Sequence, residues 1–465
     1  MKKFELTGMN LSMILLILLI QLATFLGGCQ KEPSFAKEKR LEEFATQSVN
    51  SKANTLPHTK QYTSDVATEW FNLLTEFTRT KPYTVAPAVR ILTYAGITLY
   101  ESVVPGMPSY QSIYKHLTGN TIEADNKKEY YWPACANAAI ARISTRIMQG
   151  YPSPDLTQVQ ALETVLNTSF QSRITPEQLQ FSNDFGRYVA DVIYDWSRTD
   201  GTFNPAGTPA PCPPYAPLGG LGNWVPTPPG FFPAVGQCTG NLRTFIPNIV
   251  NTVLAAPHPV YSTDPSFAFY QAASEVFQRR NAITPYEMRA FSNWRDLAPN
   301  HNPISHIVRL STGIFVKENL NLEIAAVLYA KQTMAAFDAV SAVFKSKFHY
   351  SLIRPVTYIR NVMGNNTWLS FGTTPQTPSY PDESSVIASS VAILENYFGT
   401  NYAVIDSVHQ STHGIFSYPS LNAIAEDIVE ARVSGGTIFR FGGEAGGIQG
   451  RQVGELINAL PFKKS

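Results

Sequence analysis

The stretch "KFHYSLIRP", from Lys347 to Pro355, constrains the fold strongly. Lys347 and Arg354 stand seven residues apart, and because seven residues make about two turns of an α-helix, a continuous helix would project both cations from one face. Pro355 disfavours helical geometry at the residue before it. We therefore expect a helix that ends at Arg354, with Lys347 one or two turns inside it. Two cations that converge at a helix end predict a nearby anion.

The sequence on both sides of this stretch also predicts helices. Apolar residues recur at helical spacing, and no stretch shows sustained two-residue alternation. Helices are expected at 65–79, 85–104, 132–148, 176–197, 266–280, 285–297 and 320–347, with two more that start near 381 and 422. We therefore predict one all-α domain, a multi-helix bundle, over residues 64–465.

Composition sets the class of protein. The chain has 465 residues, of which 44% are apolar, so it can bury a substantial core and is not disordered. Its net charge is only +1, and no Lys/Arg-rich run interleaves with aromatic residues. A nucleic-acid-binding surface is therefore not expected.

The N-terminus has the pattern of an export signal. Two lysines at the start precede an apolar run from Leu11 to about Phe25, which is shorter than the roughly 20 residues that a bilayer-spanning helix needs. The sequence "LGGC" ends this region at Cys29 and resembles the lipobox of bacterial lipoproteins. That resemblance implies a signal peptide at 1–28, cleavage before Cys29, and a lipid on its sulfur. An uncleaved anchor helix is the alternative.

The residues after Cys29 are polar and aperiodic, which is typical of a tether, here assigned to 29–63. Together, the signal and the tether predict a protein of the bacterial cell envelope, an outer-membrane lipoprotein that contacts the membrane through its lipid anchor. The face of the membrane on which it lies stays open.

The segment from Gly201 to Leu242 differs from the rest of the chain. It contains ten prolines and no charged residue, so we expect a long, ordered, Pro-rich loop that packs over the helices or lines a cleft mouth. Cys212 and Cys238 lie near the two ends of the loop within this segment, in what we expect to be an oxidising compartment, and we predict a disulfide between them. Cys135 lies in a helix-like apolar stretch, as a small core residue would.

Lys347, six residues, and then Arg354-Pro355 resembles the first of three motifs that mark the superfamily of vanadium-dependent haloperoxidases and type 2 phosphatidic acid phosphatases. Further segments resemble the bacterial haloperoxidase-like branch, in order from about Trp70 to Gly454: "YAGITLYESVVPGMPSY", "GNWVPTPPGFFP", "FDAVSAVFKSKFHYSLIRPVTYIR" and "FRFGGEAGG". The resemblance implies the helical fold of the vanadium haloperoxidases.

The other two motifs depart from the family pattern. Where the family has P-S-G-H, this chain has "YPDESS", which puts Asp382, Glu383 and Ser384 in place of Ser, Gly and the acid-base His. The third motif, S-R-x5-H, is matched by "ARVSGGTIFRF", which keeps Arg432 but has Ile438 in place of the vanadate-binding or phosphoryl-accepting His. An isoleucine has no lone pair to offer, and Ser384 cannot exchange a proton near neutral pH as an imidazole does.

The cationic half of the family site survives as Lys347, Arg354 and Arg432, with Asp382 and Glu383 at the helix start that they would surround. Two like charges about 5 Å apart repel by roughly 3 kcal/mol at an effective dielectric constant near 20. An incoming oxyanion would meet that repulsion, so we predict that the protein's own carboxylates neutralise the cations. Alternatively, the two acids are ordinary first-turn residues that complement the helix dipole.

Two functions follow from the resemblance. The first is a catalytically degenerate haloperoxidase- or phosphatase-like protein with a binding or structural role, no cofactor and no metal site. The alternative is an active vanadium-dependent haloperoxidase or acid phosphatase that uses relocated catalytic groups, with vanadate as its cofactor in the first case. The histidines at 301, 306, 349, 409 and 413 are the candidates for such a group, and one of them would have to lie within about 4 Å of the cations.

Overall fold

The computed structural model describes residues 58–80, 85–151, 156–204, 208–295 and 301–464. The predicted signal peptide, the predicted lipidation site at Cys29 and most of the predicted tether lie outside these residues. The last residues assigned to the tether are packed: a 3-10 helix, η1, begins at Thr59, whose buried hydroxyl donates to the Val103 carbonyl at 2.8 Å. The packed part of the chain therefore already includes residue 59.

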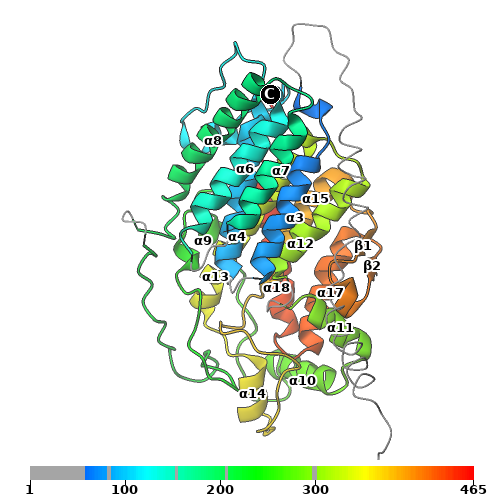
Figure 1. The fold of residues 1–465 in the computed structure, drawn as a ribbon. Helices are drawn as coiled ribbons and strands as arrows, with labels where there is room; N and C mark the ends of the chain where they lie inside the picture. Colours follow the sequence, from blue (N-terminus) through cyan, green and yellow to red (C-terminus); the bar gives the residue numbers. More distant parts are fainter. Residues whose placement is uncertain (1–57, 81–84, 152–155, 205–207, 296–300, 465) are drawn as a thin grey trace, which may run out of the picture.

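Helices make up most of the described structure (Figure 1), and none of the described helices is long and apolar enough to cross a membrane. The helical elements are η1 (Thr59–Gln61), α3 (Asp65–Thr80), α4 (Val85–Val103), η2 (Val104–Gly106), α5 (Ile113–Thr118), α6 (Trp132–Met148), α7 (Thr157–Phe170), α8 (Pro176–Ser197), η3 (Thr239–Asn241), α9 (Ile249–Thr252), α10 (Ala268–Asn281), α11 (Pro285–Asn293), α12 (Pro303–Lys317), α13 (Leu322–Tyr350), α14 (Pro355–Asn361), α15 (Ser384–Phe398), α16 (Gln410–His413), α17 (Leu421–Ser434) and α18 (Arg440–Asn458). Two short strands, β1 (Val404–Asp406) and β2 (Phe416–Tyr418), pair antiparallel. The prediction of an all-α bundle is confirmed.

Helix α13 is central to the packing. It contacts α4 on one side, where α4, α6 and α8 pack on one another, and α15 and α18 on the other side. Its 29 residues include a nearly continuous run of buried side chains. One hydrophobic cluster contains residues of α13, of α4, α6 and α8, and of α15 and α18. A helix that is apolar on most of its surface has to be enclosed in this way.

The predicted end of this helix is wrong. Helix α13 ends at Tyr350, because Ser351 takes the left-handed conformation with φ 47° and its N–H donates to the Lys347 carbonyl. Arg354 lies beyond the helix in extended geometry and precedes α14, as Pro355 requires. Lys347 and Arg354 therefore approach one another from two different elements and not from one helix face.

The expected boundaries of α6 and α8 match the structure, whereas α7, α12, α18 and the β1–β2 hairpin were not anticipated. Helix α18 contains several glycines, which lower its intrinsic helix propensity. The hairpin strands have three residues each, too few for a detectable alternation.

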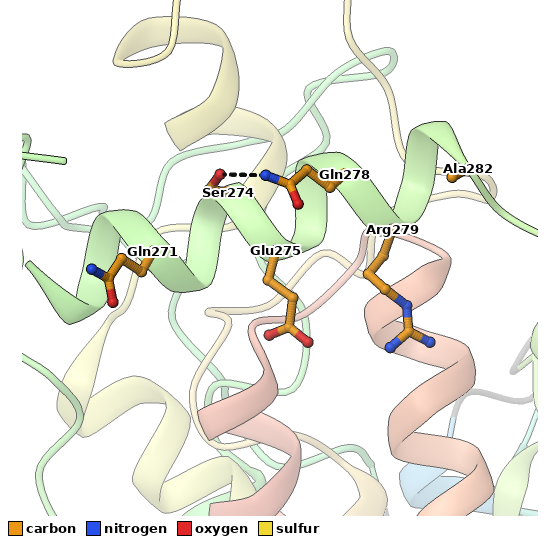
Figure 2. A pocket seen from close by; sticks show the side chains of 6 residues that line it. All are labelled: Gln271, Ser274, Glu275, Gln278, Arg279 and Ala282. Carbon is orange, nitrogen blue, oxygen red and sulfur yellow. Dashed lines mark hydrogen bonds between the residues drawn. The ribbon is translucent and has the colours of Figure 1, made fainter. Parts of the chain in front are cut away.

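Helix α10 lies against the last turns of α17 and the first turn of α18, on either side of the third motif. Its Glu275 and Arg279 point toward α17 and α18 (Figure 2), where Glu275 pairs with Arg440 at 2.7 Å and Arg279 pairs with Glu430 at 3.0 Å. A groove of about 420 Å³ runs along this helix. It is lined by Ala282, which directly follows α10, and by five α10 residues: Gln271, Ser274, Glu275, Gln278 and Arg279.

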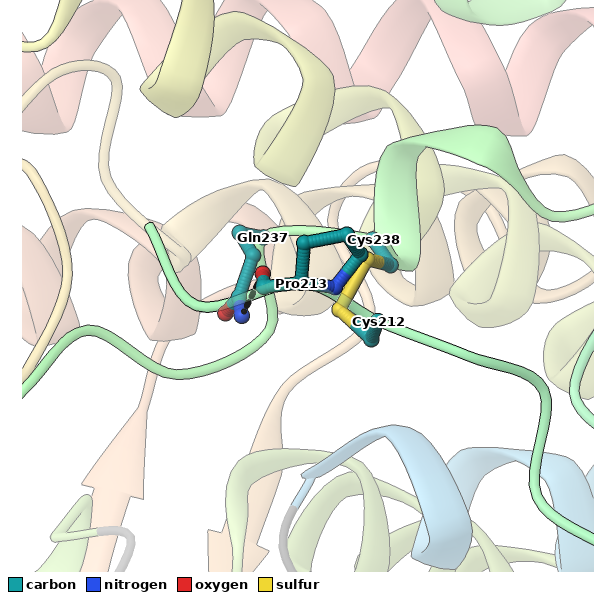
Figure 3. Close-up of a disulfide and its surroundings, with 4 residues drawn as sticks. All are labelled: Cys212, Pro213, Gln237 and Cys238. Carbon is teal, nitrogen blue, oxygen red and sulfur yellow. Dashed lines mark hydrogen bonds between the residues drawn. A yellow bond between two sulfur atoms is a disulfide. The ribbon is translucent and has the colours of Figure 1, made fainter. Parts of the chain in front are cut away.

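The Pro-rich segment has no helix or strand between residue 208 and η3. Cys212 and Cys238 form a disulfide with a Cα–Cα distance of 5.8 Å (Figure 3), and beside it the Gln237 side-chain amide donates to the Pro213 carbonyl at 2.9 Å. The backbone N–H of Trp224 donates to the Ser351 carbonyl at 2.6 Å. The segment is thus fastened to the end of α13. Cys135 is a buried free thiol in α6.

Replacing both Cys212 and Cys238 by serine is expected to lower the free energy of unfolding by about 3 kcal/mol, because the disulfide restricts the unfolded chain. Denaturant unfolding of both proteins, with and without reductant, measures this. Reductant should destabilise only the parent protein. If both thiols of the unreduced, denatured parent react freely with an alkylating reagent, the disulfide is absent in solution.

Candidate functional site

The three retained cations come together in the folded chain, and we call Lys347, Arg354 and Arg432 the cation cluster. Lys347 comes from the last turns of α13, Arg354 from the link before α14, and Arg432 from the last turn of α17. Their exposed fractions are 0%, 1% and 8%. Burying three cations in one place is unfavourable unless oxygen atoms compensate them.

Asp382 compensates Arg432. One terminal nitrogen of Arg432 donates to both carboxylate oxygens of Asp382, at 3.0 and 2.8 Å, and the pair is buried. The same carboxylate accepts the backbone N–H of Ser384 at 2.8 Å. Burial alone would raise the pKa of Asp382, but Arg432 and the other two cations hold this pKa below its usual value. Asp382 therefore serves both as a helix-start acceptor and as the partner of a buried cation.

Glu383 faces Lys347 more loosely. The Lys347 ammonium lies 3.7 Å from the Glu383 carboxylate and donates a hydrogen bond to the Pro378 carbonyl at 2.9 Å. Burial lowers the pKa of Lys347 to about 8, although Glu383 acts in the opposite direction. The structure thus brings the two acids and the cation cluster together, with a direct hydrogen bond for Asp382 and a longer ionic contact for Glu383.

Arg354 is compensated by neutral oxygens. Its guanidinium donates to the Thr377 carbonyl at 2.7 Å, to the Thr377 hydroxyl at 2.8 Å and to the Thr437 carbonyl at 3.0 Å. These bonds connect the link before α15 to the link before α18. Burial lowers the pKa of Arg354 to about 10. The sequence motif predicts the cation, but only the fold shows that it ties two loops together.

Ser384 and Ile438, the two positions at which the motifs predict a lost histidine, are also integrated into the packing. The Ser384 hydroxyl donates to the Gly443 carbonyl at 3.0 Å. Ile438 is buried in a second apolar cluster with Phe269, Tyr358 and Phe439. The proton of the Ser384 hydroxyl is thus used in a structural hydrogen bond, and the isoleucine side chain has neither a lone pair nor an exchangeable proton.

Helix α18 holds the start of α15 in place through close contact at two glycines. A Cβ atom at Gly446 would lie 2.3 Å from the Asp382 carbonyl oxygen, and one at Gly450 would lie 2.0 Å from the Ser385 carbonyl oxygen. Only glycine permits such an approach between helix backbones. The position of Asp382 therefore depends on α18.

Four of the five candidate histidines form a separate cluster. Ring centroids of His301 and His306 lie 5.3 and 5.0 Å from that of His409, and His413 lies 5.8 Å from it. His306 bonds the Asp406 carboxylate at 2.9 Å. Within the described ranges, no group of three or more His, Cys, Asp or Glu side chains has the geometry of a metal site.

The remaining candidate, His349, packs its ring edge against Tyr350. A histidine that the sequence reasoning missed, His258, lies closer to the altered motifs: its ring centroid is 5.3 Å from that of Tyr380 and 6.5 Å from that of Phe441. Its Nδ1 atom is 2.8 Å from the Pro259 carbonyl oxygen. No periodic pattern surrounds His258 in the sequence, so no local signal identified it.

The low pKa of Lys347 predicts a pH dependence. Between about pH 8 and its usual value of 10.5, the folded state has lost a proton that the unfolded state keeps, so the free energy of unfolding rises with pH by up to about 1.4 kcal/mol per unit. In Lys347→Met this contribution should vanish. Unfolding measured from pH 8 to 10 should therefore show a steeper rise for the parent. Lys331→Met, which removes another lysine whose pKa burial lowers to about 8, should flatten the slope in the same way, and equal slopes in the parent and Lys347→Met would contradict the prediction.

Comparison with known proteins agrees with this architecture. Residues 327–461 match the family model of the VCPO second helical-bundle domain. The crystal structure of the first bacterial vanadium-dependent iodoperoxidase superposes with a TM-score of 0.78 at 24% sequence identity, over 90% of this chain and 99% of that chain. No curated protein matches the sequence.

Bacterial vanadium-dependent chloroperoxidase is similar to a lesser degree. Its apo form gives a TM-score of 0.64 at 15% identity, over 83% of this chain and 96% of that one, and its holo form gives 0.61 at 15% identity, over 90% and 97%. The resemblance inferred from the motifs is therefore confirmed for the fold and for the second helical bundle.

Proposed function

We propose that this chain, which has the fold of the bacterial vanadium-dependent haloperoxidases, is a lipid-anchored and catalytically degenerate form of that fold with a binding or structural role. The observation that carries the proposal is the buried pair between Arg432 and Asp382. A carboxylate of the protein itself takes up a cation that the family motif reserves for an exogenous oxyanion.

The residues present do not fit vanadate. Ile438 is buried among apolar side chains and cannot coordinate a metal, and the Ser384 hydroxyl is bonded to the Gly443 carbonyl. Asp382 and Glu383 add negative charge next to the cation cluster. An anion that enters would be repelled by roughly 3 kcal/mol per like charge at about 5 Å, which weakens binding by about a hundredfold.

Calorimetry of the full chain in detergent with vanadate, phosphate and sulfate tests the proposal. We expect no measurable binding by the unmodified protein. The fourfold variant Asp382→Ser, Glu383→Gly, Ser384→His, Ile438→His should bind vanadate or phosphate, because it removes both carboxylates and restores both imidazoles. The matched control lacks only Ile438→His and should bind vanadate more weakly. Tight vanadate binding by the unmodified protein would refute the proposal.

His258 supports the alternative, an active enzyme with a relocated histidine. Its aromatic neighbours Tyr380 and Phe441 are close in sequence to Asp382 and Ile438. Under this alternative, the unmodified protein oxidises halide or hydrolyses a phosphate ester, and His258→Gln lowers kcat by about 100-fold or more. His349→Gln is the control, since His349 contacts Tyr350.

The lipid anchor predicts a defined N-terminus. Mature protein should begin at a lipidated Cys29 and partition with membranes, and Cys29→Ala should prevent both the lipidation and the cleavage before residue 29. Mass spectrometry of the N-terminal peptide and fractionation of membranes measure this. Unchanged processing and unchanged partitioning in Cys29→Ala would exclude a lipoprotein anchor.

A further inference from the structure

The Pro-rich segment exposes an unusual number of apolar side chains. Between residues 218 and 235 six large hydrophobic residues are exposed, in a segment that has no charged residue from 201 to 242. They are Leu218, Leu221, Val225, Phe231, Phe232 and Val235. Apolar residues that are concentrated on a protein surface mark a protein or membrane contact more often than scattered single ones do.

The exposed side chains are presented from a fixed base. Trp224 is fully buried and its backbone N–H donates to the Ser351 carbonyl, while the Tyr215 and Ser351 hydroxyls share a hydrogen bond of 2.7 Å. The disulfide and a close contact of Gly236 with Phe344 fasten the far end of the segment. Because the base is already ordered, contact with a partner costs little conformational entropy here.

Two adjacent phenylalanines stand out. Phe231 and Phe232 are 61% and 55% exposed, and the Phe231 N–H bonds the Thr227 carbonyl at 2.9 Å to close a turn. Both side chains are therefore exposed at a turn that is joined to the buried part of the segment, with the Phe232 ring lying against Gly230.

A groove of about 420 Å³ lies between the same segment and α14. Its lining contains no charged residue and includes Leu221, the most exposed of the six, at 83%. The lining residues are Gly220, Leu221, Gly222, Asn223, Val225, Tyr261, Thr263, Ile353, Thr357, Asn361 and Val362.

We propose that this surface, the exposed residues of 218–235, contacts a lipid bilayer and inserts Phe231 and Phe232 among the acyl chains. Interfaces between proteins have polar rims and are enriched in arginine, whereas this segment has no charge with which to select a protein partner. An uncharged surface of aromatic and aliphatic side chains matches the boundary of headgroups and acyl chains. The proposal rests on the lipid anchor of the proposed function, because that anchor supplies the bilayer.

The position of the anchor allows this contact. Element η1 lies at the start of α13 and the Pro-rich segment is bonded to its end, so the two are about 43 Å apart along a helix of this length. The chain from Cys29 to residue 58 can span up to about 95 Å when extended. A lipid on Cys29 and the tip at Phe231 can therefore reach the same bilayer.

Quenching by brominated lipids tests the proposal. The full chain is reconstituted into phosphatidylcholine vesicles with brominated acyl chains, in variants that carry one added tryptophan: Phe231→Trp, Phe232→Trp, or the control Val165→Trp, an exposed position on α7. The added emission should be quenched at least about threefold more at 231 and 232 than at 165, because acyl chains surround only the former. Equal Tm values confirm that the variants fold alike.

Two results would overturn the proposal. One is equal or absent quenching at the three positions. The other is an emission at 231 that shifts to the blue with protein concentration and without lipid quenching, which would assign the surface to a second copy of the chain. Failure of the anchor is read separately from the mass of the N-terminal peptide: quenching without a lipidated Cys29 would leave the surface proposal standing alone.

Discussion

Asp382→Asn is expected to lower the free energy of unfolding by about 3–5 kcal/mol, since it breaks a buried ion pair from one side only. The Asp382 carboxylate accepts two hydrogen bonds from Arg432 and one from the Ser384 backbone. An amide has one oxygen and no charge, so it cannot replace both functions. Denaturant unfolding at pH 7 measures the difference.

Glu383→Gln is the matched comparison. Glu383 lies 3.7 Å from the Lys347 ammonium, so its neutralisation should cost less, about 1–3 kcal/mol. If Asp382→Asn costs no more than Glu383→Gln, or if both are neutral, the two carboxylates do not compensate the cation cluster. The alternative, that both acids are ordinary first-turn residues that complement the helix dipole, would then be the better interpretation.

Gly450→Ala should destabilise the protein by about 3 kcal/mol or more, because the added methyl group overlaps a backbone atom that a rotamer change cannot move. The new Cβ would lie 2.0 Å from the Ser385 carbonyl oxygen. Helices α15 and α18 would have to separate, and the start of α15 carries Ser384 next to Asp382. Thermal and denaturant unfolding both report this loss.

Gly447→Ala provides the control on the same helix. Nothing lies within 4 Å of a Cβ at this position, and alanine favours helix over glycine by up to about 1 kcal/mol. The two substitutions should therefore change stability in opposite directions. A Gly450→Ala protein as stable as the parent would show that α18 does not pack against α15 as described.

The retained cations have a consequence for the stability of the fold. Arg354 connects the links at Thr377 and Thr437, and Arg432 holds Asp382 at the start of α15. Both therefore contribute to packing regardless of whether an oxyanion binds. Such a structural contribution is a physical reason for the presence of these cations whether or not the site is catalytic.

The sequence by itself determined the class of the fold and the composition of the site. Helical periodicity sufficed for α6 and α8 because their apolar residues face a core over many turns. The motifs around Lys347, Arg354 and Arg432 sufficed to predict that three cations lie together. Chains that share a fold keep such motifs in the same order, so the order predicts which residues meet. The motif resemblance also predicts that Ser384 and Ile438 stand where the family has histidines.

Only the tertiary structure decided which oxygen atoms compensate the buried cations. Periodicity gave no sign that α13 ends at Tyr350, because a single residue, Ser351, in the left-handed conformation stops the helix. Helix α18 forms although its glycines lower the helix propensity. Because glycine has no side chain, α18 can pack closely against α15, and helix propensity does not include the free energy of that packing. Likewise, Arg432 bonds Asp382 while Arg354 bonds neutral oxygens, since hydrogen-bond partners depend on distances across the fold and not on spacing along the chain.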